Sequence, residues 1–217
     1  MRVAAIADIH SNLHALRAVL DEVDRSGMDL LVCAGDTVGY GPFPNECCRE
    51  VKHAADRIIA GNPDLSALTR DVGGMNPYAA EAALWTADAL DAESSSLLKS
   101  LDGSARFELA GKSFAVFHGS PRDPVEYVFE EDVREETVEG VTQDFLILGH
   151  THVPFVRRVG SVTVVNPGSV GQPRDGNPRA SFAIIDTSAA EVDIVRKPYD
   201  AGVAAEAIAE KGLPKAL

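Results

Sequence analysis

Short apolar runs and longer amphipathic stretches alternate along the first part of the chain. Residues 2–7 and 30–34 form mostly apolar runs of the kind found in buried strands. Between them, residues 13–25 carry apolar side chains at helical spacing and charged side chains on the opposite face, and Gly27 ends the pattern. The sequence therefore predicts strands and helices in turn, as in α/β proteins.

Apolar and polar positions predict further elements along the rest of the chain. We expect helices at residues 45–53, 130–139 and 203–211, strands at 57–60 and 145–148, and hairpins over 107–117, 155–165 and 182–195. Residues 65–102 read as helices and interrupt the alternation. We interpret the chain as one domain over residues 1–217, with a helical insertion at about 65–102 that overhangs the functional site.

Composition and charge narrow the classes of partner. The chain has 217 residues, 45% of them hydrophobic, which is enough for one substantial core. Its net charge of −13 opposes non-specific binding to nucleic acid or to anionic lipid, so we expect no stable nucleic-acid complex and no membrane partner. A phosphate-bearing substrate would need a locally positive group to attract it, and a bound metal ion would supply one.

We expect no export signal, and the cysteines form no pattern that implies a disulfide framework. Met1 leads directly into the first apolar run, and no apolar run is long enough to span a bilayer. Cys33 lies in an apolar run, and Cys47 and Cys48 are adjacent. We therefore expect a cytoplasmic protein with three buried or inert thiols.

Two histidines follow the apolar run at residues 145–148. They occur in the segment Gly149-His150-Thr151-His152, and an extended loop would turn His150 and His152 to the same side. Imidazole nitrogen is a common ligand of borderline metals, so this loop can bind one ion or two adjacent ions. The alternative is a pair of hydrogen-bonded loop histidines.

Other polar side chains follow predicted strands in the same way. These are Asp8, His10, Asp36, Asn62 and His118. Taken singly, each has a structural explanation: Asp8 as a helix cap, Asp36 and Asn62 as turn residues, and His118 as a hydrogen-bonded histidine. Ser11 or Asn12 already offers the helix cap, which leaves Asp8 and His10 free for another role.

Taken together, the seven side chains predict a metal centre. Carboxylate, imidazole and amide oxygen without thiolate suit Mn²⁺, Fe, Zn²⁺ or Mg²⁺ better than a sulfur-rich structural zinc site does. Seven ligands are too many for one tetrahedral ion. They suit two ions about 3.5–4 Å apart that share a carboxylate, the arrangement that serves phosphate hydrolysis.

The ordered set of motifs resembles the calcineurin-like metallophosphoesterase superfamily over nearly the whole chain. The motifs are Asp8-x-His10, Gly35-Asp36-x-Val38-Gly39, Gly61-Asn62, the isolated His118 and Gly149-His150-Thr151-His152. The stretch at residues 166–174 is similar to the small single-domain bacterial and archaeal branch, which includes phosphodiesterases and diadenosine tetraphosphatase-related proteins. The resemblance implies a four-layer αββα sandwich of two mixed sheets flanked by helices, with the metals at the carboxyl edges of the sheets.

The resemblance also implies roles for individual residues. Asp8, His10 and His152 would hold the first metal, Asn62, His118 and His150 the second, and Asp36 would bridge both. A metal-bridging hydroxide would attack phosphorus, with Asp36 and His150 counted among the catalytic residues. The cofactor would be two divalent ions, with Mn²⁺ favoured and Fe, Zn²⁺, Ni²⁺ or Mg²⁺ as alternatives. Arg122 and Arg174 would contact the phosphate of a small phosphorylated substrate, with a nucleotide among the candidates.

One residue departs from the family pattern. The common motif Gly-Asn-His-Asp reads Gly61-Asn62-Pro63-Asp64 here, so the histidine credited with protonating the leaving group is absent. A missing general acid costs about 10²–10⁴-fold in rate where the leaving group is poor. We therefore expect a phosphodiester or a nucleotide anhydride as substrate, with Asp64, His14 or a water as a substitute acid.

Two other classes of function stay open at this point. The first is a phosphomonoesterase or protein phosphatase of the same fold. The second is a non-catalytic metal-binding interaction module, as in the retromer scaffold subunit of the superfamily. The oligomeric state also stays open, with a homodimer as one possibility. A dinucleotide-binding oxidoreductase is excluded because no G-x-G-x-x-G follows the first strand.

Overall fold

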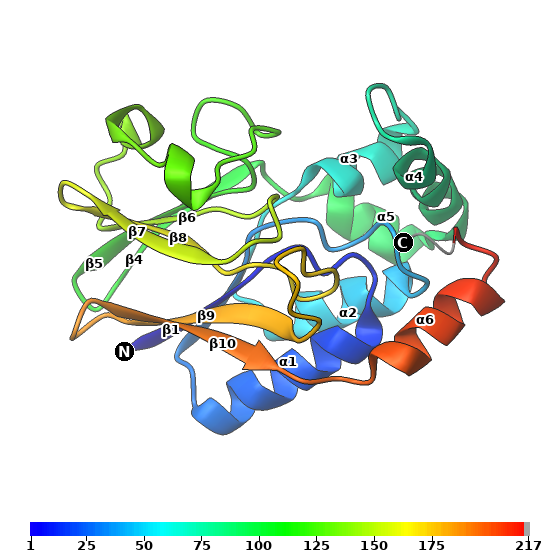
Figure 1. The fold of residues 1–217 in the computed structure, drawn as a ribbon, viewed down its shortest axis with the longest axis horizontal. Coiled ribbons are helices and arrows are strands. Elements are labelled where there is room, and N and C mark those ends of the chain that lie inside the picture. Colours follow the sequence, from blue (N-terminus) through cyan, green and yellow to red (C-terminus); the bar gives the residue numbers. More distant parts are fainter. Residues whose placement is uncertain (215–217) are drawn as a thin grey trace.

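Two five-stranded sheets form the centre of the computed structural model, which describes residues 1–214 (Figure 1). The first sheet has the order β10-β9-β1-β2-β3 and consists of β1 (Arg2–Ile6), β2 (Leu30–Cys33), β3 (Arg57–Ile58), β9 (Ala180–Asp186) and β10 (Glu191–Lys197). The second has the order β4-β5-β6-β8-β7 and consists of β4 (Ser104–Leu109), β5 (Lys112–Phe117), β6 (Phe145–Ile147), β7 (Phe155–Val159) and β8 (Val162–Asn166). Both sheets mix parallel and antiparallel pairs, as expected.

The inner faces of the two sheets bury one apolar core. Val3 and Val32 of the first sheet belong to the same cluster as Phe114, Phe145 and Val165 of the second. The Phe114 and Phe145 rings stack with their centroids 5.0 Å apart. These strands are apolar along most of their length because both of their faces are covered.

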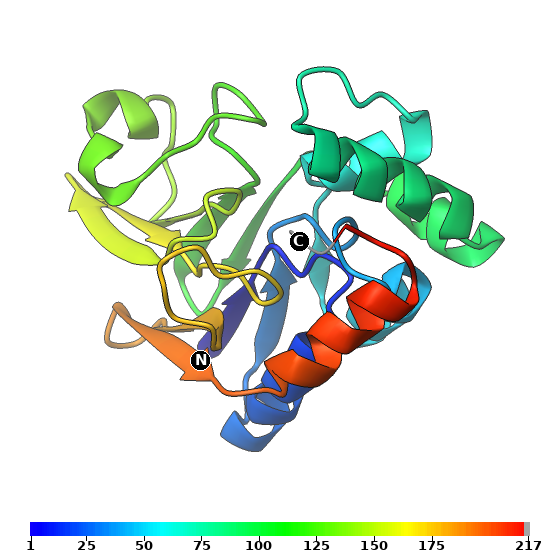
Figure 2. The ribbon, with the colours of Figure 1, turned by 45° about the vertical axis from the view of Figure 1, so that its right-hand side comes forward.

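Helices cover the outer face of the first sheet. α1 (Leu13–Ser26) and α2 (Pro44–Ala54) bury their apolar stripes against it, and α6 (Ala201–Glu210) lies beside α1 (Figure 2). The Asn12 side chain caps α1 by accepting a hydrogen bond from the Ala15 amide, and Gly27 ends the helix in the left-handed conformation. The remaining helices, α3 (Asn62–Thr69), α4 (Pro77–Ala89) and α5 (Ala92–Lys99), follow one another without a strand between them.

The outer face of the second sheet has a thinner cover than expected. The prediction of an acidic helix at residues 130–139 is wrong, because this segment forms two short 3₁₀ helices, η1 (Glu130–Asp132) and η2 (Glu135–Val138). Val133, between them, has an extended backbone and is buried among apolar residues of this sheet. The predicted strand at residues 57–60 is also shorter, because only Arg57–Ile58 pair with β2.

The other predicted elements are confirmed within one to three residues at each end. The two-sheet sandwich flanked by helices is the expected fold. Cys33, Cys47 and Cys48 are all free and buried. Among residues 1–214, none of the helices combines the length and the apolar character that a bilayer crossing requires.

Candidate functional site

The loops that follow β1, β2, β5 and β6 bring their polar side chains to one place. Two overlapping groups form there, Asp8, His10, Asp36 and His152 in one, and Asp36, His118 and His150 in the other. Within each group the possible ligand atoms all lie within 4.8 Å of one another. We call these six residues the strand-tip cluster. Asp36 belongs to both groups, so the cluster has two centres with a shared carboxylate.

Backbone hydrogen bonds join the loops that carry the cluster. The amide of His10 donates to the carbonyl of Asp36 at 3.0 Å, which joins the loops after β1 and β2. The amide of Gly149 donates to the carbonyl of His118 at 2.8 Å, which joins the loops after β5 and β6. The His150 amide donates to Oδ1 of Asp8 at 3.1 Å and so connects the two sheets. The relative positions of the side chains are therefore fixed by main-chain contacts.

The backbone of the cluster is strained. Among residues 1–214, ten non-glycine residues have positive φ, and five of them are Asp8, His10, Asp36, His150 and His152. Each left-handed non-glycine residue costs of order 1–3 kcal/mol and persists only where its surroundings enforce it. Such strain is concentrated at functional sites, which supports the functional interpretation of this cluster.

Gly61 allows the loop before α3 to pass directly against Asp36. A Cβ atom at Gly61 would lie 1.9 Å from Oδ1 of Asp36 and 2.5 Å from its backbone nitrogen. Any larger residue would displace the shared carboxylate. The glycine in Gly61-Asn62 is thus required by the close approach of two loops.

Each histidine of the cluster is oriented by a backbone carbonyl. The pairs are His10 Nδ1 with Val38 O at 3.3 Å, His118 Nδ1 with Ala34 O at 2.9 Å, His152 Nδ1 with Gln172 O at 2.6 Å and His150 Nε2 with Val125 O at 3.1 Å. In a neutral imidazole, a ring nitrogen that donates to a carbonyl leaves the other nitrogen as an acceptor. This second-shell pattern is typical of metal-binding histidines.

Several polar atoms of the site are buried without a hydrogen-bond partner. They are Oδ2 of Asp8, Oδ1 of Asp36, Oδ1 of Asn62 and Nε2 of His118, and of these Oδ1 of Asp36 and Nε2 of His118 have only an ion-pair contact with each other, at 3.2 Å. Nε2 of His10 and Nε2 of His152 face each other at 3.0 Å. A buried polar atom without a partner is costly, and so many of them at one place need a compensating group. Divalent cations would compensate all of them, so these residues fit the metals that the sequence predicts.

Burial and mutual charge set the protonation of the cluster. Burial lowers the pKa of His150 to about 4, and burial followed by the charge of Arg174 lowers that of His152 to about 3. Burial raises the pKa of Asp8 to about 7. Burial also opposes the charge on His118, but the carboxylates of Asp36 and Asp8 and the hydrogen bond to the Ala34 carbonyl together outweigh it and raise the pKa of His118 to about 10. At neutral pH, His150 and His152 therefore have free lone pairs.

Asp64 is placed to brace the loops. It is fully buried, and its two carboxylate oxygens accept hydrogen bonds from the amides of Val38 and Gly61, each at 2.9 Å. This geometry gives Asp64 a structural role, because both of its oxygens are already bound to backbone amides. His14 lies outside the cluster, with its ring edge-on to Phe43 at 5.5 Å.

The two predicted phosphate contacts occupy different surroundings. Arg122 is exposed and forms an ion pair with Glu126 at 2.6 Å. Arg174 lies two residues after Gln172, whose carbonyl contacts His152. The backbone amide of Arg174 donates to the carbonyl of His152 at 3.3 Å. Its charge contributes to lowering the pKa of His152 and of His10, so it lies near the cluster. The structure thus favours Arg174 over Arg122 as a residue that meets an anion there.

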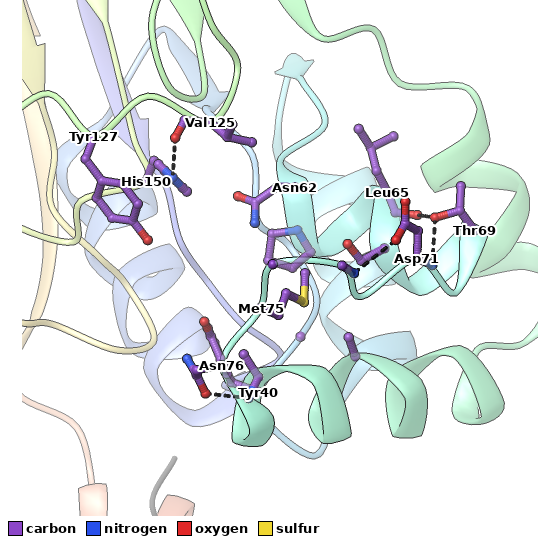
Figure 3. Close-up of a pocket in the computed structure, with 17 residues that line it drawn as sticks. Tyr40, Asn62, Leu65, Thr69, Asp71, Met75, Asn76, Val125, Tyr127 and His150 are labelled. Carbon is purple, nitrogen blue, oxygen red and sulfur yellow. Dashed lines mark hydrogen bonds between the residues drawn. The ribbon is translucent and has the colours of Figure 1, made fainter.

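A cavity of about 670 Å³ opens beside the cluster (Figure 3). Asn62 and His150 line it on the cluster side, and residues of α3, α4 and the loop between them line the other side. Tyr127 also lines it, with its ring centroid 4.1 Å from that of His150. We call this space the first cavity. Its size is that of a site for a small-molecule ligand.

Asn166 has a supporting role that the sequence motifs did not reveal. It is fully buried, and its side-chain nitrogen donates to the carbonyl of Gly149 at 2.9 Å and to the Thr151 hydroxyl at 3.0 Å. Its side-chain oxygen accepts from the Gly168 amide at 2.8 Å. Asn166 therefore ties the histidine loop to the loop after β8. The only sequence signal is an Asn-Pro-Gly turn after a buried strand.

The fold and the site define a class of metal-binding hydrolase domains, and the comparisons with known proteins agree. Residues 1–190 match the calcineurin-like phosphoesterase superfamily domain, and the chain belongs to that superfamily. An uncharacterised protein of Methanocaldococcus jannaschii is 36% identical over 99% of this chain and 95% of its own length. The phosphodiesterase YfcE of Escherichia coli is 27% identical over 88% of this chain and 91% of its own length.

Solved structures share the whole fold. A metallophosphoesterase from Sphaerobacter thermophilus superimposes with a TM-score of 0.86 at 34% identity, covering 100% of this chain and 96% of that one. A protein from Pyrococcus horikoshii superimposes with a TM-score of 0.89 at 22% identity, covering 98% and 94%. The similarity therefore extends over α3, α4 and α5 as well as the two sheets.

Proposed function

We propose that this protein hydrolyses a phosphodiester or a nucleotide phosphoanhydride with two divalent ions, of which Mn²⁺ is favoured. The observation that carries the proposal is the pair of overlapping ligand groups that share Asp36 and contain buried polar atoms without partners. Homology to a phosphodiesterase supports the choice of substrate class.

The proposed ligands divide into two sets and one shared residue. Asp8, His10 and His152 would hold one ion, Asn62, His118 and His150 the other, and Asp36 both. Bound there, divalent ions would neutralise charge on the phosphoryl oxygens and lower the pKa of water.

The other residues of the site would bind and orient the substrate. Arg174 adds positive charge beside the cluster, which would attract a phosphate to a protein with a net charge of −13. The first cavity would take an organic group attached to that phosphate. Pro63 lines this cavity and has no proton to donate, so a leaving group that departs without protonation is favoured.

The test is hydrolysis of bis-p-nitrophenyl phosphate and of p-nitrophenyl phosphate. The protein is chelated, measured, reloaded with Mn²⁺, Ni²⁺ or Zn²⁺ and measured again, alongside Asp36→Asn. Asp88→Asn is the matched control, because Asp88 is an exposed carboxylate on α4 with an ion pair to Arg70. We expect metal-dependent cleavage of the diester in the wild type and in Asp88→Asn, and its loss in Asp36→Asn.

Two results would contradict the proposal. No turnover by protein that binds two ions per chain would favour a non-catalytic binding module. Faster turnover of the monoester than of the diester would favour a phosphomonoesterase of the same fold.

A further inference from the structure

A second cavity has Tyr40 as a lining residue in common with the first. Its volume is about 230 Å³, and residues of the loop after His10 and of the helix α6 line it. Phe43, Tyr199, Ala205 and Ile208 contribute to its lining. We call it the second cavity. It is smaller than the roughly 300–1,000 Å³ of sites that enclose a whole small molecule, so it would hold only part of one.

The two cavities meet different members of the strand-tip cluster. His150 and Asn62 line the first cavity, whereas His10 lines the second. Tyr40 lines both, and its ring meets that of His10 edge-on with the centroids 4.5 Å apart. A phosphorus atom placed at the cluster would therefore have a separate cavity available on each side.

The lining of the second cavity selects a neutral ring. None of the described residues that line it is Lys, Arg, Asp or Glu, and its only imidazoles are His10 and His14, so a charged group would find few partners there. The side-chain nitrogen of Asn12 already donates to the Gly171 carbonyl at 2.9 Å and to the Tyr199 hydroxyl at 3.3 Å. Aromatic and proline side chains make up much of the remaining surface, which suits a flat apolar group.

We propose that the second cavity binds one arm of a phosphate ester whose two arms each carry a ring. The arms would occupy the two cavities, and the phosphate would lie between them at the cluster. The substrate class is thus a diester or anhydride with two aromatic or nucleobase-like groups, and a small alkyl ester would leave one cavity unused. This inference rests on the proposed function, because it assumes that the phosphate binds at the cluster.

The first test fills the second cavity with a side chain. Ala205 is an exposed residue of α6 that lines the cavity, so Ala205→Phe places a ring inside it. Ala209→Phe is the matched control, because Ala209 is also exposed on α6 and does not line the cavity. If Ala205→Phe does not fold, Ala201→Phe fills the same cavity from the first turn of the helix.

The kinetic readout compares bis-p-nitrophenyl phosphate with methyl p-nitrophenyl phosphate, using Mn²⁺-loaded protein. We expect Ala205→Phe to lower kcat/KM for the two-ringed ester by about tenfold relative to Ala209→Phe, from the lost burial of one ring. If kcat/KM for the methyl ester is unchanged in Ala205→Phe, the non-leaving arm of the substrate occupies this cavity. If kcat/KM falls equally for both esters, the leaving arm occupies it. Equal kcat/KM in the two variants for both esters would overturn the inference.

A binding readout separates this inference from the proposed function. Saturation-transfer NMR on metal-free protein with thymidine 5′-monophosphate p-nitrophenyl ester distinguishes the thymine protons from the nitrophenyl protons. We expect the wild type and Ala209→Phe to saturate both rings and Ala205→Phe to saturate only one. The same pattern in all three proteins would refute a ring in the second cavity. Absence of diester hydrolysis, in contrast, would refute the proposed function and leave this readout valid.

Discussion

The strand-tip cluster and the two cavities beside it are constructed in different ways. The side chains of the cluster are nearly inaccessible, and backbone hydrogen bonds join the loops that carry them. The first cavity, in contrast, is bordered by Leu65, Val125 and Tyr127, each about half exposed. The second is bordered by small exposed residues of α6.

The rigid cluster would therefore carry the chemistry, and the more open cavities would set the substrate preference. A change of one atom in the cluster has no space to relax into, whereas a change at a cavity wall meets solvent or a flexible side chain. We therefore expect substitutions near the cluster to abolish function and substitutions in the cavities to change substrate preference. Four predictions test this contrast, from the largest expected effect to the smallest.

The largest effect is expected from Gly61→Ala. The new Cβ would lie 1.9 Å from Oδ1 of Asp36, so the shared carboxylate or the loop must move. Overpacking of this kind costs about 1–3 kcal/mol of folding free energy, and we expect metal binding and hydrolysis to be lost with it. Thermal unfolding and metal content by elemental analysis measure the two effects.

Gly103→Ala is the control for this substitution. Nothing lies within 4 Å of a Cβ at Gly103, so the same chemical change should leave stability and metal content unaltered. A Gly61→Ala protein that binds two ions per chain would show that the loops of the cluster can move apart, contrary to the contrast drawn here.

A smaller effect is expected from Asn166→Ala, which leaves the cluster itself intact. The substitution removes both donors to the histidine loop and leaves the buried Gly168 amide without its acceptor. Loss of a supporting residue typically lowers metal affinity by about 10–100-fold. Competition with a fluorescent chelator would measure the affinity. Asn177→Ala is the matched control, since Asn177 makes its hydrogen bonds within an exposed loop.

Metal affinity should also depend on pH, because cations displace protons from the cluster. His118, with a pKa raised to about 10, is protonated at neutral pH, and Asp8, with a pKa raised to about 7, is partly protonated. Both must lose a proton to bind a cation, so affinity should rise by about tenfold per pH unit between pH 7 and 9 and more steeply below pH 7. His150 and His152 are neutral above about pH 4 and contribute nothing to this slope. Calorimetry in buffers of different ionisation enthalpy counts the released protons, and a constant affinity from pH 6.5 to 8.5 would contradict the expectation.

The same contrast explains what the sequence could predict. Asp8 and Asp36 follow neighbouring parallel strands of the first sheet, and His118 and His150 follow neighbouring parallel strands of the second. The carboxyl ends of neighbouring parallel strands meet at one edge, so these two pairs were predictable, whereas their meeting across the two sheets follows from the packing of the sheets. The two short 3₁₀ helices at Glu130–Asp132 and Glu135–Val138 were not predictable, because burial of Val133 against the second sheet overrides the local helical pattern.

The surroundings of the cluster depend on contacts between distant segments, which no local pattern reveals. Tyr40, Asn62 and Tyr127 meet at the first cavity, and Phe43 and Tyr199 at the second. The carboxylate of Asp64 reads as a candidate acid in sequence, and only the structure shows both of its oxygens bound to backbone amides. Local spacing thus predicts which residues carry the chemistry, whereas tertiary packing decides what lies next to them.

The smallest effect is expected at Tyr127, which belongs to the first cavity but touches the cluster through His150. Its ring packs 4.1 Å from the His150 ring and is half exposed toward the cavity. An aromatic contact is worth about 0.5–1.5 kcal/mol, so Tyr127→Ala should raise KM for a ring-bearing diester by about 2- to 12-fold. Tyr127→Phe keeps the ring and should stay close to the wild type. Steady-state kinetics of the three proteins provide the measurement, with metal content unchanged in all of them. A large fall in kcat or in metal content of Tyr127→Ala would mean that this residue supports the cluster as well as the cavity, and the division between the two regions would then fail at His150.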